Sequence, residues 1–204
     1  MAVYAYALIP NHFHFLVKCK PVTPDILEKI KTENTKKSYA FLQGEVSYND
    51  FIVGQFTRYF RSYAGAFNKE NGRTGSLFQE GFKRITVQNR EHFRFLLFYL
   101  HHNGIHHNLG KDFLDWIHTS YGYYLQQGNE VSNEVRGTFK VPRTSEDLLI
   151  KLYFDTVLDI FSNEIPYSLT KPSESSLNNF ITFHEEQKEG LYPNLKKYKG
   201  STFE

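Results

Sequence analysis

Two histidines, His12 and His14, lie two residues apart in an apolar, aromatic run, and this run constrains the fold more than any other stretch. It covers residues 5–17, Ala-Tyr-Ala-Leu-Ile-Pro-Asn-His-Phe-His-Phe-Leu-Val, a composition typical of strand. Because successive strand side chains point to opposite faces, His12 and His14 project to one side. Phe13 and Phe15 project to the other side, where we expect them to be buried. Two imidazoles this close on a rigid strand form half of a metal site, although a histidine in an apolar strand is more often a core residue.

The composition is that of a globular protein, and the positive charge is concentrated in one region. Of the 204 residues, 40% are hydrophobic and 23% are charged, and the net charge of +2 is too small to indicate nucleic acid by itself. Between residues 51 and 90, however, seven basic residues accompany two acidic ones, a local balance of +5. The single cysteine, Cys19, excludes an intramolecular disulfide and suits a reducing compartment. No segment approaches the ~20 apolar residues of a membrane helix, so we expect a cytoplasmic protein with no membrane partner.

The periodicity of the apolar residues predicts an α+β chain. The expected strands are residues 3–9, 12–19 and 82–87, the first two separated by Pro10-Asn11. The expected helices are residues 25–31, 47–70, 91–103, 145–162 and 174–187. Asn89 is expected to cap the third of these helices, which should end near Gly104. Residues 32–47 are polar and weakly patterned, so we expect them to be irregular.

Three blocks of sequence together resemble one family. They are Pro-Asn-His-Phe-His-Phe-Leu-Val at 10–17, Gly-Arg-Thr-Gly-Ser-Leu-Phe-Gln at 72–79 followed by Phe-Lys-Arg-Ile at 82–85, and Tyr-Leu-His-His-Asn at 99–103. They resemble the HUH (histidine, hydrophobic residue, histidine) single-tyrosine transposases, in particular the REP-associated branch. Residues 112–121 resemble the closing Asp-x-x-x-Trp-x-x-Ser-Ser-Tyr element of that family. The resemblance therefore covers residues 3–125.

This resemblance implies a tyrosine nucleophile and a divalent metal ion, Mg²⁺ or Mn²⁺. At the matching positions, Tyr99 is the nucleophile, and the metal ligands are His12, His14 and Asn103. Helical spacing places Tyr99 and Asn103 on one face. The implied substrate is single-stranded, often hairpin-forming DNA, cut through a 5′-phosphotyrosine intermediate. From the local charge, the residues that we expect to contact the DNA backbone are Arg58, Arg61, Arg73, Lys83 and Arg84.

The resemblance also implies a fold and a division of the chain. The expected fold is a ferredoxin-like or RRM-like α+β core, in which an antiparallel sheet carries the histidines and helices cover one face. We assign residues 1–126 to this catalytic domain, 127–146 to a linker and 147–204 to a small helical C-terminal region. Two departures stand out: Gly104 replaces the usual proline after Asn103, and the HUH motif begins within a dozen residues of Met1, whereas family members usually carry an opening strand and a helix before it. Either the start of the gene is misassigned or degenerate, or the sheet of this relative lacks its first strand and helix.

Two other functions fit the same residues. The protein could be a DNA-hairpin-binding relative that no longer cuts, with Arg58 and Arg61 either holding phosphates or simply solvated. It could instead be a zinc-binding regulatory domain that uses the cluster His101, His102, His106 and His107. A homodimer is compatible with each function, and in the transposase Tyr99 could then serve its own chain or the partner chain.

Overall fold

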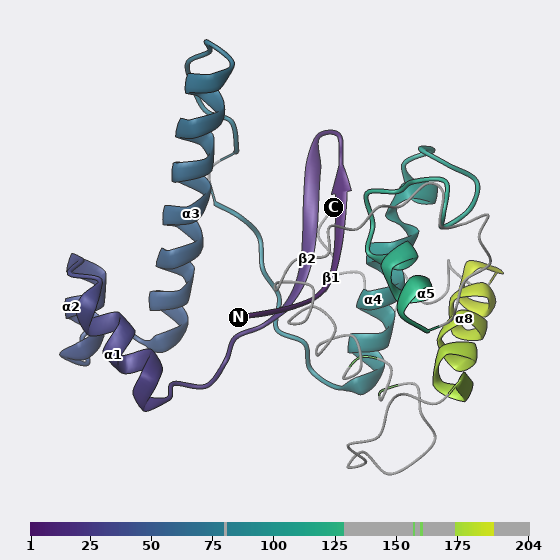
Figure 1. Cartoon of the computed structure of the whole chain (residues 1–204), viewed down its shortest axis with the longest axis horizontal. Helices are drawn as coiled ribbons and strands as arrows, with labels where there is room; N and C mark the ends of the chain where they lie inside the picture. The colour runs from purple at the N-terminus through teal and green to yellow at the C-terminus, as the bar shows by residue number, and fades with distance from the viewer. Residues whose placement is uncertain (80, 129–156, 158–159, 161–173, 190–204) are drawn as a thin grey trace. The chain divides into compact units, whose positions relative to one another are not determined.

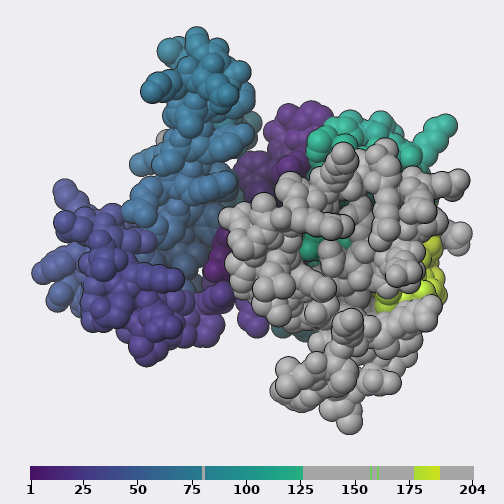
Figure 2. Space-filling view, viewed as in Figure 1, coloured from purple at the N-terminus to yellow at the C-terminus, as the bar shows by residue number. Residues whose placement is uncertain are grey.

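The computed structural model describes residues 1–79, 81–128, 157, 160 and 174–189 (Figure 1). The chain forms two compact units: unit 1 comprises Met1–Lys18 and Ile85–Glu204, and unit 2 comprises Cys19–Arg84. Figure 2 shows the surface coloured along the chain. As predicted, the architecture is α+β, with a two-stranded antiparallel sheet and six helices among the described residues. No helix in this part of the chain combines the length and the apolar composition needed to cross a membrane.

Unit 1 is built on a β-hairpin. Strand β1 (Ala2–Ile9) pairs antiparallel with β2 (His12–Lys18), and Pro10-Asn11 forms the turn, as predicted. In this register Ala7 lies opposite His14. The short turn therefore fixes which side chains of β1 lie on the same face of the hairpin as the histidines.

The other edge of β1 is paired with a segment around Thr119. Leu8 N donates to His118 O at 2.9 Å, and Ser120 N donates to Tyr6 O at 3.0 Å. The Trp116 indole adds a hydrogen bond to Leu8 O at 2.9 Å. This segment satisfies ladder groups that an uncovered edge strand would leave unpaired.

The histidine face of the hairpin, and not the phenylalanine face, is turned to the core. Ala7 and Leu16 are buried on this face, and helix α4 (Arg90–His106) packs against both strands. On the opposite face Phe15 is 45% exposed, and the Phe13 ring packs against it at 5.3 Å between centroids. The expected burial of Phe15 is therefore wrong, because α4 covers the other side of the strand.

Helix α4 passes through Gly104 and ends at His106, beyond its predicted end. Its start is as predicted, with Asn89 Oδ1 accepting from His92 N at 2.8 Å. Trp116 packs directly on Gly104, where an added Cβ would lie 2.5 Å from the Trp116 Cβ. Glycine at this position therefore admits the tryptophan side chain and does not end the helix.

Two further helices complete the described part of unit 1. They are α5 (Tyr121–Gly128) and α8 (Glu174–Glu189), and α8 lies against both α4 and α5 (Figure 1). Helix α8 confirms the helix predicted at 174–187. Most of the predicted helix at 145–162 and of the linker at 127–146 lies outside the described residues.

A buried chain of hydrogen bonds joins α8 to α4. His184 Nδ1 donates to Phe180 O at 2.8 Å, because a carbonyl can only accept. His184 Nε2 then accepts from His101 Nδ1 at 2.9 Å, and His101 Nε2 accepts from the Ser120 hydroxyl at 2.8 Å. Every bond in this chain is satisfied when both imidazoles are neutral.

Unit 2 consists of three helices and an irregular segment. The helices are α1 (Pro24–Thr32), α2 (Lys36–Leu42) and α3 (Tyr48–Glu70). Helices α1 and α3 were predicted, whereas α2 lies within residues 32–47, which were expected to be irregular. Thr35 caps α2 by accepting from Ser38 N at 3.0 Å, and Phe41 stacks on Phe51 of α3 at 5.0 Å. A tertiary aromatic contact thus stabilises a helix too short to form alone.

The predicted strand at 82–87 is absent, and these residues are irregular. The rings of Phe78 and Phe82 pack against Phe60 of α3 at 5.3 and 5.7 Å. The β-branched and aromatic content of 82–87 suggested a strand, but no neighbouring strand pairs with it among the described residues. This segment is therefore held by packing of its aromatic rings against α3 and not by pairing in a sheet.

Replacing Gly104 with alanine is expected to destabilise the protein, although alanine normally stabilises a helix interior by ~1 kcal/mol relative to glycine. The added methyl group would press on Trp116, and overpacking typically costs ~1–3 kcal/mol. Urea unfolding followed by circular dichroism measures the change. Gly65→Ala in α3 is the matched control, since an added Cβ there meets nothing within 4 Å, and it should stabilise. A gain in stability for Gly104→Ala would contradict this packing.

Acid should destabilise unit 1 through the pair His101 and His184. Burial, together with His184, lowers the pKa of His101, and burial also lowers the pKa of His184. The pKa of histidine in an unfolded chain is ~6.5, so the unfolded state gains protons first, and stability falls as the pH drops below that value. Each ring contributes ~1.4 kcal/mol per pH unit.

The measurement is urea unfolding at a series of pH values, followed by fluorescence of Trp116, the only tryptophan. His184→Gln should reduce the slope of stability against pH by ~1.4 kcal/mol per pH unit. Gly65→Ala, which removes no titrating group, should leave the slope unchanged. Equal slopes in all three proteins would refute the role of the buried pair.

Candidate active site

Strand β2 and helix α4 bring together the four residues that the motifs single out. The His12 and His14 rings lie on one face of β2 with centroids 5.0 Å apart. The edge-on contact between the His14 and Tyr99 rings has a centroid distance of 5.6 Å. Asn103 lies one helical turn beyond Tyr99 and donates from Nδ2 to the Tyr99 carbonyl at 2.7 Å. The predicted nucleophile and the predicted metal ligands therefore form one cluster in unit 1.

The turn residue Asn11 orients His12. Its Oδ1 accepts a hydrogen bond from His12 Nδ1 at 2.7 Å. Because Nδ1 carries the proton, the lone pair of the neutral ring lies on Nε2, the atom available to a metal ion. The sequence predicted Asn11 only as a turn residue. Its position directly before His12 was the available signal for this contact.

Two buried polar atoms of the cluster have no hydrogen-bond partner among the described residues. They are His14 Nε2 and Asn103 Oδ1. Leaving such an atom unsatisfied costs ~1–3 kcal/mol. Asn103 is fully buried, and the bond from its amide nitrogen to Tyr99 O leaves Oδ1 as the unused end. A cation would satisfy either atom, and an imidazole nitrogen and an amide oxygen are both donors that a divalent metal ion accepts, so the chemistry of the residues present fits such an ion.

Burial and neighbouring histidines favour the neutral form of His12 and His14. Burial lowers the pKa of His14 to about 4, with further lowering by His12 and His107. Burial and the neighbouring His106 also lower the pKa of His12. Neutral imidazole is the form that binds metals, and it suits Mn²⁺ better than Mg²⁺, which prefers oxygen ligands. Two imidazoles and an amide carry no charge, so they would leave the full charge of a bound ion available to a phosphate.

The four histidines of the alternative zinc cluster do not all come together in the structure, although the His106 and His107 rings lie 5.0 Å apart. Both ring nitrogens of His101 are engaged in the buried chain with His184 and Ser120. His107 also lies beside His12, with ring centroids 4.8 Å apart. In the part of the chain that the structure describes, no group of three His, Cys, Asp or Glu side chains could hold a metal ion. The cluster of His12, His14 and Asn103 contains only two such side chains, since its third donor is an amide.

The five basic residues predicted to contact DNA all belong to unit 2, and all five are exposed. Arg58 and Arg61 lie on α3, and Arg58 forms an ion pair with Glu33 at 3.6 Å. Arg73 follows α3 and lies over the Phe67 ring at 5.8 Å. Lys83 and Arg84 end the irregular segment. The predicted site residues are therefore divided between unit 1, which holds half-buried His12 and His14 with buried Tyr99 and Asn103, and unit 2, which holds the exposed cations.

Comparisons of the chain with protein-family models, with curated proteins and with solved structures gave no match. The chemistry assigned to the cluster therefore depends on the sequence motifs and on the geometry described above.

Proposed function

We propose that the protein is a DNA strand transferase and single-strand endonuclease of the HUH tyrosine-transposase type. One observation carries the proposal: His14 Nε2 and Asn103 Oδ1 are buried polar atoms without partners among the described residues, and they belong to residues in contact with Tyr99. Both atoms belong to the ligand set that the motifs imply. The residues that the motifs select as metal ligands thus include two that carry an unsatisfied buried atom, and this agreement favours a metal-assisted reaction at Tyr99.

The chemistry follows from the needs of a phenol nucleophile. A tyrosine hydroxyl has a reference pKa of ~10 and is a weak nucleophile at neutral pH. A divalent cation held by His12, His14 and Asn103 would polarise a non-bridging oxygen of the phosphodiester and make phosphorus easier to attack. The chain itself restrains the nucleophile, since the His14 ring packs edge-on against Tyr99.

In the proposed step, the Tyr99 oxygen forms a bond to phosphorus and the bond from phosphorus to the 3′ oxygen breaks. The phenolic proton leaves to water, and the released 3′ oxygen gains a proton. The products are a 5′-phosphotyrosine link and a free 3′-hydroxyl. That hydroxyl can later attack the link and rejoin strands without a nucleotide cofactor, which suits transposition. The exposed cations of unit 2 would hold the DNA backbone.

A second candidate is a protein that binds DNA hairpins without cutting them. The observation in its favour is that only 7% of Tyr99 is exposed. A phosphodiester must reach the hydroxyl for attack, and a covered ring limits this approach. The two candidates differ in one product, the covalent link between Tyr99 and DNA.

The test is to incubate the protein with labelled single-stranded hairpin DNA and Mn²⁺ and to look for a covalent adduct by denaturing electrophoresis. We expect an adduct in the wild-type protein, with the label mapped to the Tyr99 peptide by mass spectrometry. Tyr99→Phe should abolish it, because no hydroxyl remains to form the ester. Removal of Mn²⁺ by a chelator should also abolish it.

Tyr59→Phe is the matched control, since Tyr59 is an exposed tyrosine of α3 that lies outside the cluster. This variant should form as much adduct as the wild type. Binding of the hairpin by the wild-type protein with no adduct would reject strand transfer in favour of the binding-only candidate.

A further inference from the structure

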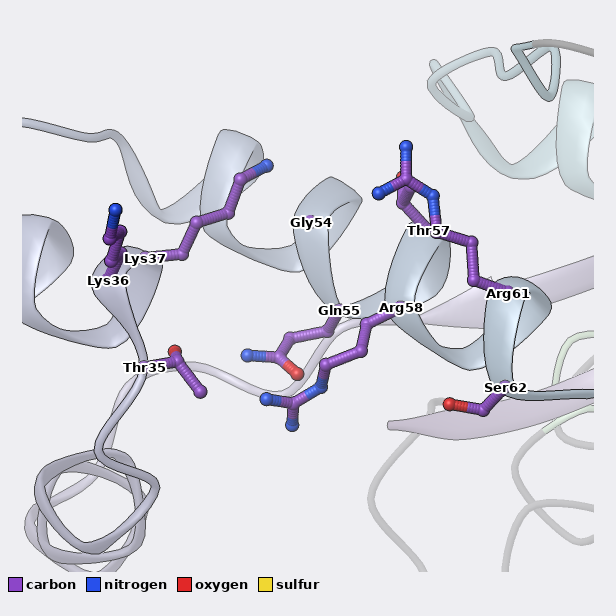
Figure 3. A pocket seen from close by; sticks show the side chains of 9 residues that line it. All are labelled: Thr35, Lys36, Lys37, Gly54, Gln55, Thr57, Arg58, Arg61 and Ser62. Carbon is purple, nitrogen blue, oxygen red and sulfur yellow. The ribbon is translucent and has the colours of Figure 1, made fainter. Parts of the chain in front are cut away.

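A cavity of about 540 Å³ in unit 2 is bounded by α2 and α3 (Figure 3). Four cations line it: Lys36 and Lys37 from α2, and Arg58 and Arg61 from α3. No aspartate or glutamate lines it, and neither does any aromatic residue. Its size falls within the ~300–1,000 Å³ typical of ligand sites. The wall therefore favours an anion and offers no ring on which a nucleobase could stack.

Glu33 holds part of this wall in place. Its Oε2 atom accepts from Gln55 Nε2 at 3.0 Å and lies 3.6 Å from an Arg58 guanidinium nitrogen. Figure 3 shows Gln55 and Arg58 extending side by side from α3. Among the described residues, Arg58 is the one cation of the four with an ion-pair partner. Four cations against one carboxylate leave a local charge of +3, a repulsion that a bound anion would relieve.

Gly54 allows Lys37 to lie against α3. A Cβ at position 54 would be 2.6 Å from Lys37 Cδ and 2.7 Å from Lys37 Nζ. Glycine in a helix interior is less favourable than alanine by ~1 kcal/mol. The end of the lysine side chain crosses α3 at this glycine, and a Cβ at position 54 would displace it.

We propose that this cavity binds phosphate groups of a single-stranded nucleic-acid backbone. Arginine offers a planar fork of donors to phosphate oxygens, and lysine offers a compact charge. Gln55 adds an uncharged donor group to the same wall. Lys36 and Lys37 join Arg58 and Arg61 in the contact with the strand, and Gly54 positions Lys37. The inference rests on the proposed function for the identity of the strand as DNA.

The test measures binding of a labelled single-stranded DNA oligonucleotide to the full-length protein by fluorescence anisotropy, in EDTA and over a series of salt concentrations. Lys36→Gln/Lys37→Gln should raise Kd and make the slope of log K against log salt shallower by about 1.4, since each phosphate contact contributes ~0.7 for a single strand. Lys29→Gln/Lys31→Gln removes the same charge from α1, outside the cavity wall, and should leave the slope unchanged. An unchanged slope in the first variant, or equal losses in both, would overturn the proposal.

Gly54→Ala provides an independent variant that removes no charge. The new methyl group should displace the Lys37 side chain and weaken DNA binding several-fold, while thermal stability stays equal to or above that of the wild type. A Gly54→Ala protein that binds DNA as the wild type does would contradict the positioning role of Gly54.

A competition experiment distinguishes binding of a nucleic-acid strand from binding of a free anion. Inorganic phosphate at matched ionic strength should displace the labelled oligonucleotide far less effectively than unlabelled oligonucleotide does. Equal displacement would assign the cavity to a free anion and reject the backbone assignment. The assay contains no metal ion and reports binding alone, so its outcome does not depend on attack by Tyr99. Failure here is therefore distinguishable from failure of the adduct experiment.

Discussion

The packing of α4 on the histidine face of the hairpin is the contact on which the core and the candidate active site both depend. Alanines at positions 5 and 7 of β1 present little side chain, and both are buried beneath the helix. This close approach brings Tyr99 against the His14 ring. The same helix carries His101, whose neutral ring links α4 to α8 through His184. One helix thus serves the core and the candidate site together, so a substitution that shifts α4 should affect stability and chemistry at once.

In the described part of the chain, buried polar atoms on α4 are hydrogen-bonded at one residue and left without a partner at another. The nitrogens of His101 are all satisfied by protein partners, which makes this part of the core specific but sensitive to acid. Asn103, two residues further along, has one end satisfied and the other unused. A fully paired network is what a structural role requires, and an unused buried acceptor is more typical of a ligand-binding site. This contrast supports the metal assignment to Asn103 more strongly than the motif does alone.

Local signals in the sequence predicted the hairpin at Pro10-Asn11, helices α1, α3, α4 and α8, and the Asn89 cap. Where tertiary packing decides the outcome, the prediction was wrong. Helix α2 depends on the stacking of Phe41 on Phe51, the exposed face of Phe15 depends on where α4 lies, and residues 82–87 lack a partner strand. The motifs at residues 10–17 and 99–103 contain His12, His14, Tyr99 and Asn103, so the sequence alone was enough to single out these four residues. The position of Asn11 directly before His12 was a signal for their contact that the prediction did not use. The cations of α2 could not be predicted as part of a cavity wall, since this depends on side-chain placement.

The central claim is that His12, His14 and Asn103 form a metal site beside Tyr99, and diffraction from crystals grown with Mn²⁺ tests it most directly. Anomalous scattering at the manganese edge locates the ion without reference to activity or DNA. The account predicts one strong peak within bonding distance of His12 Nε2, His14 Nε2 and Asn103 Oδ1. A peak confined to other histidines, or no peak beside Tyr99, would contradict it.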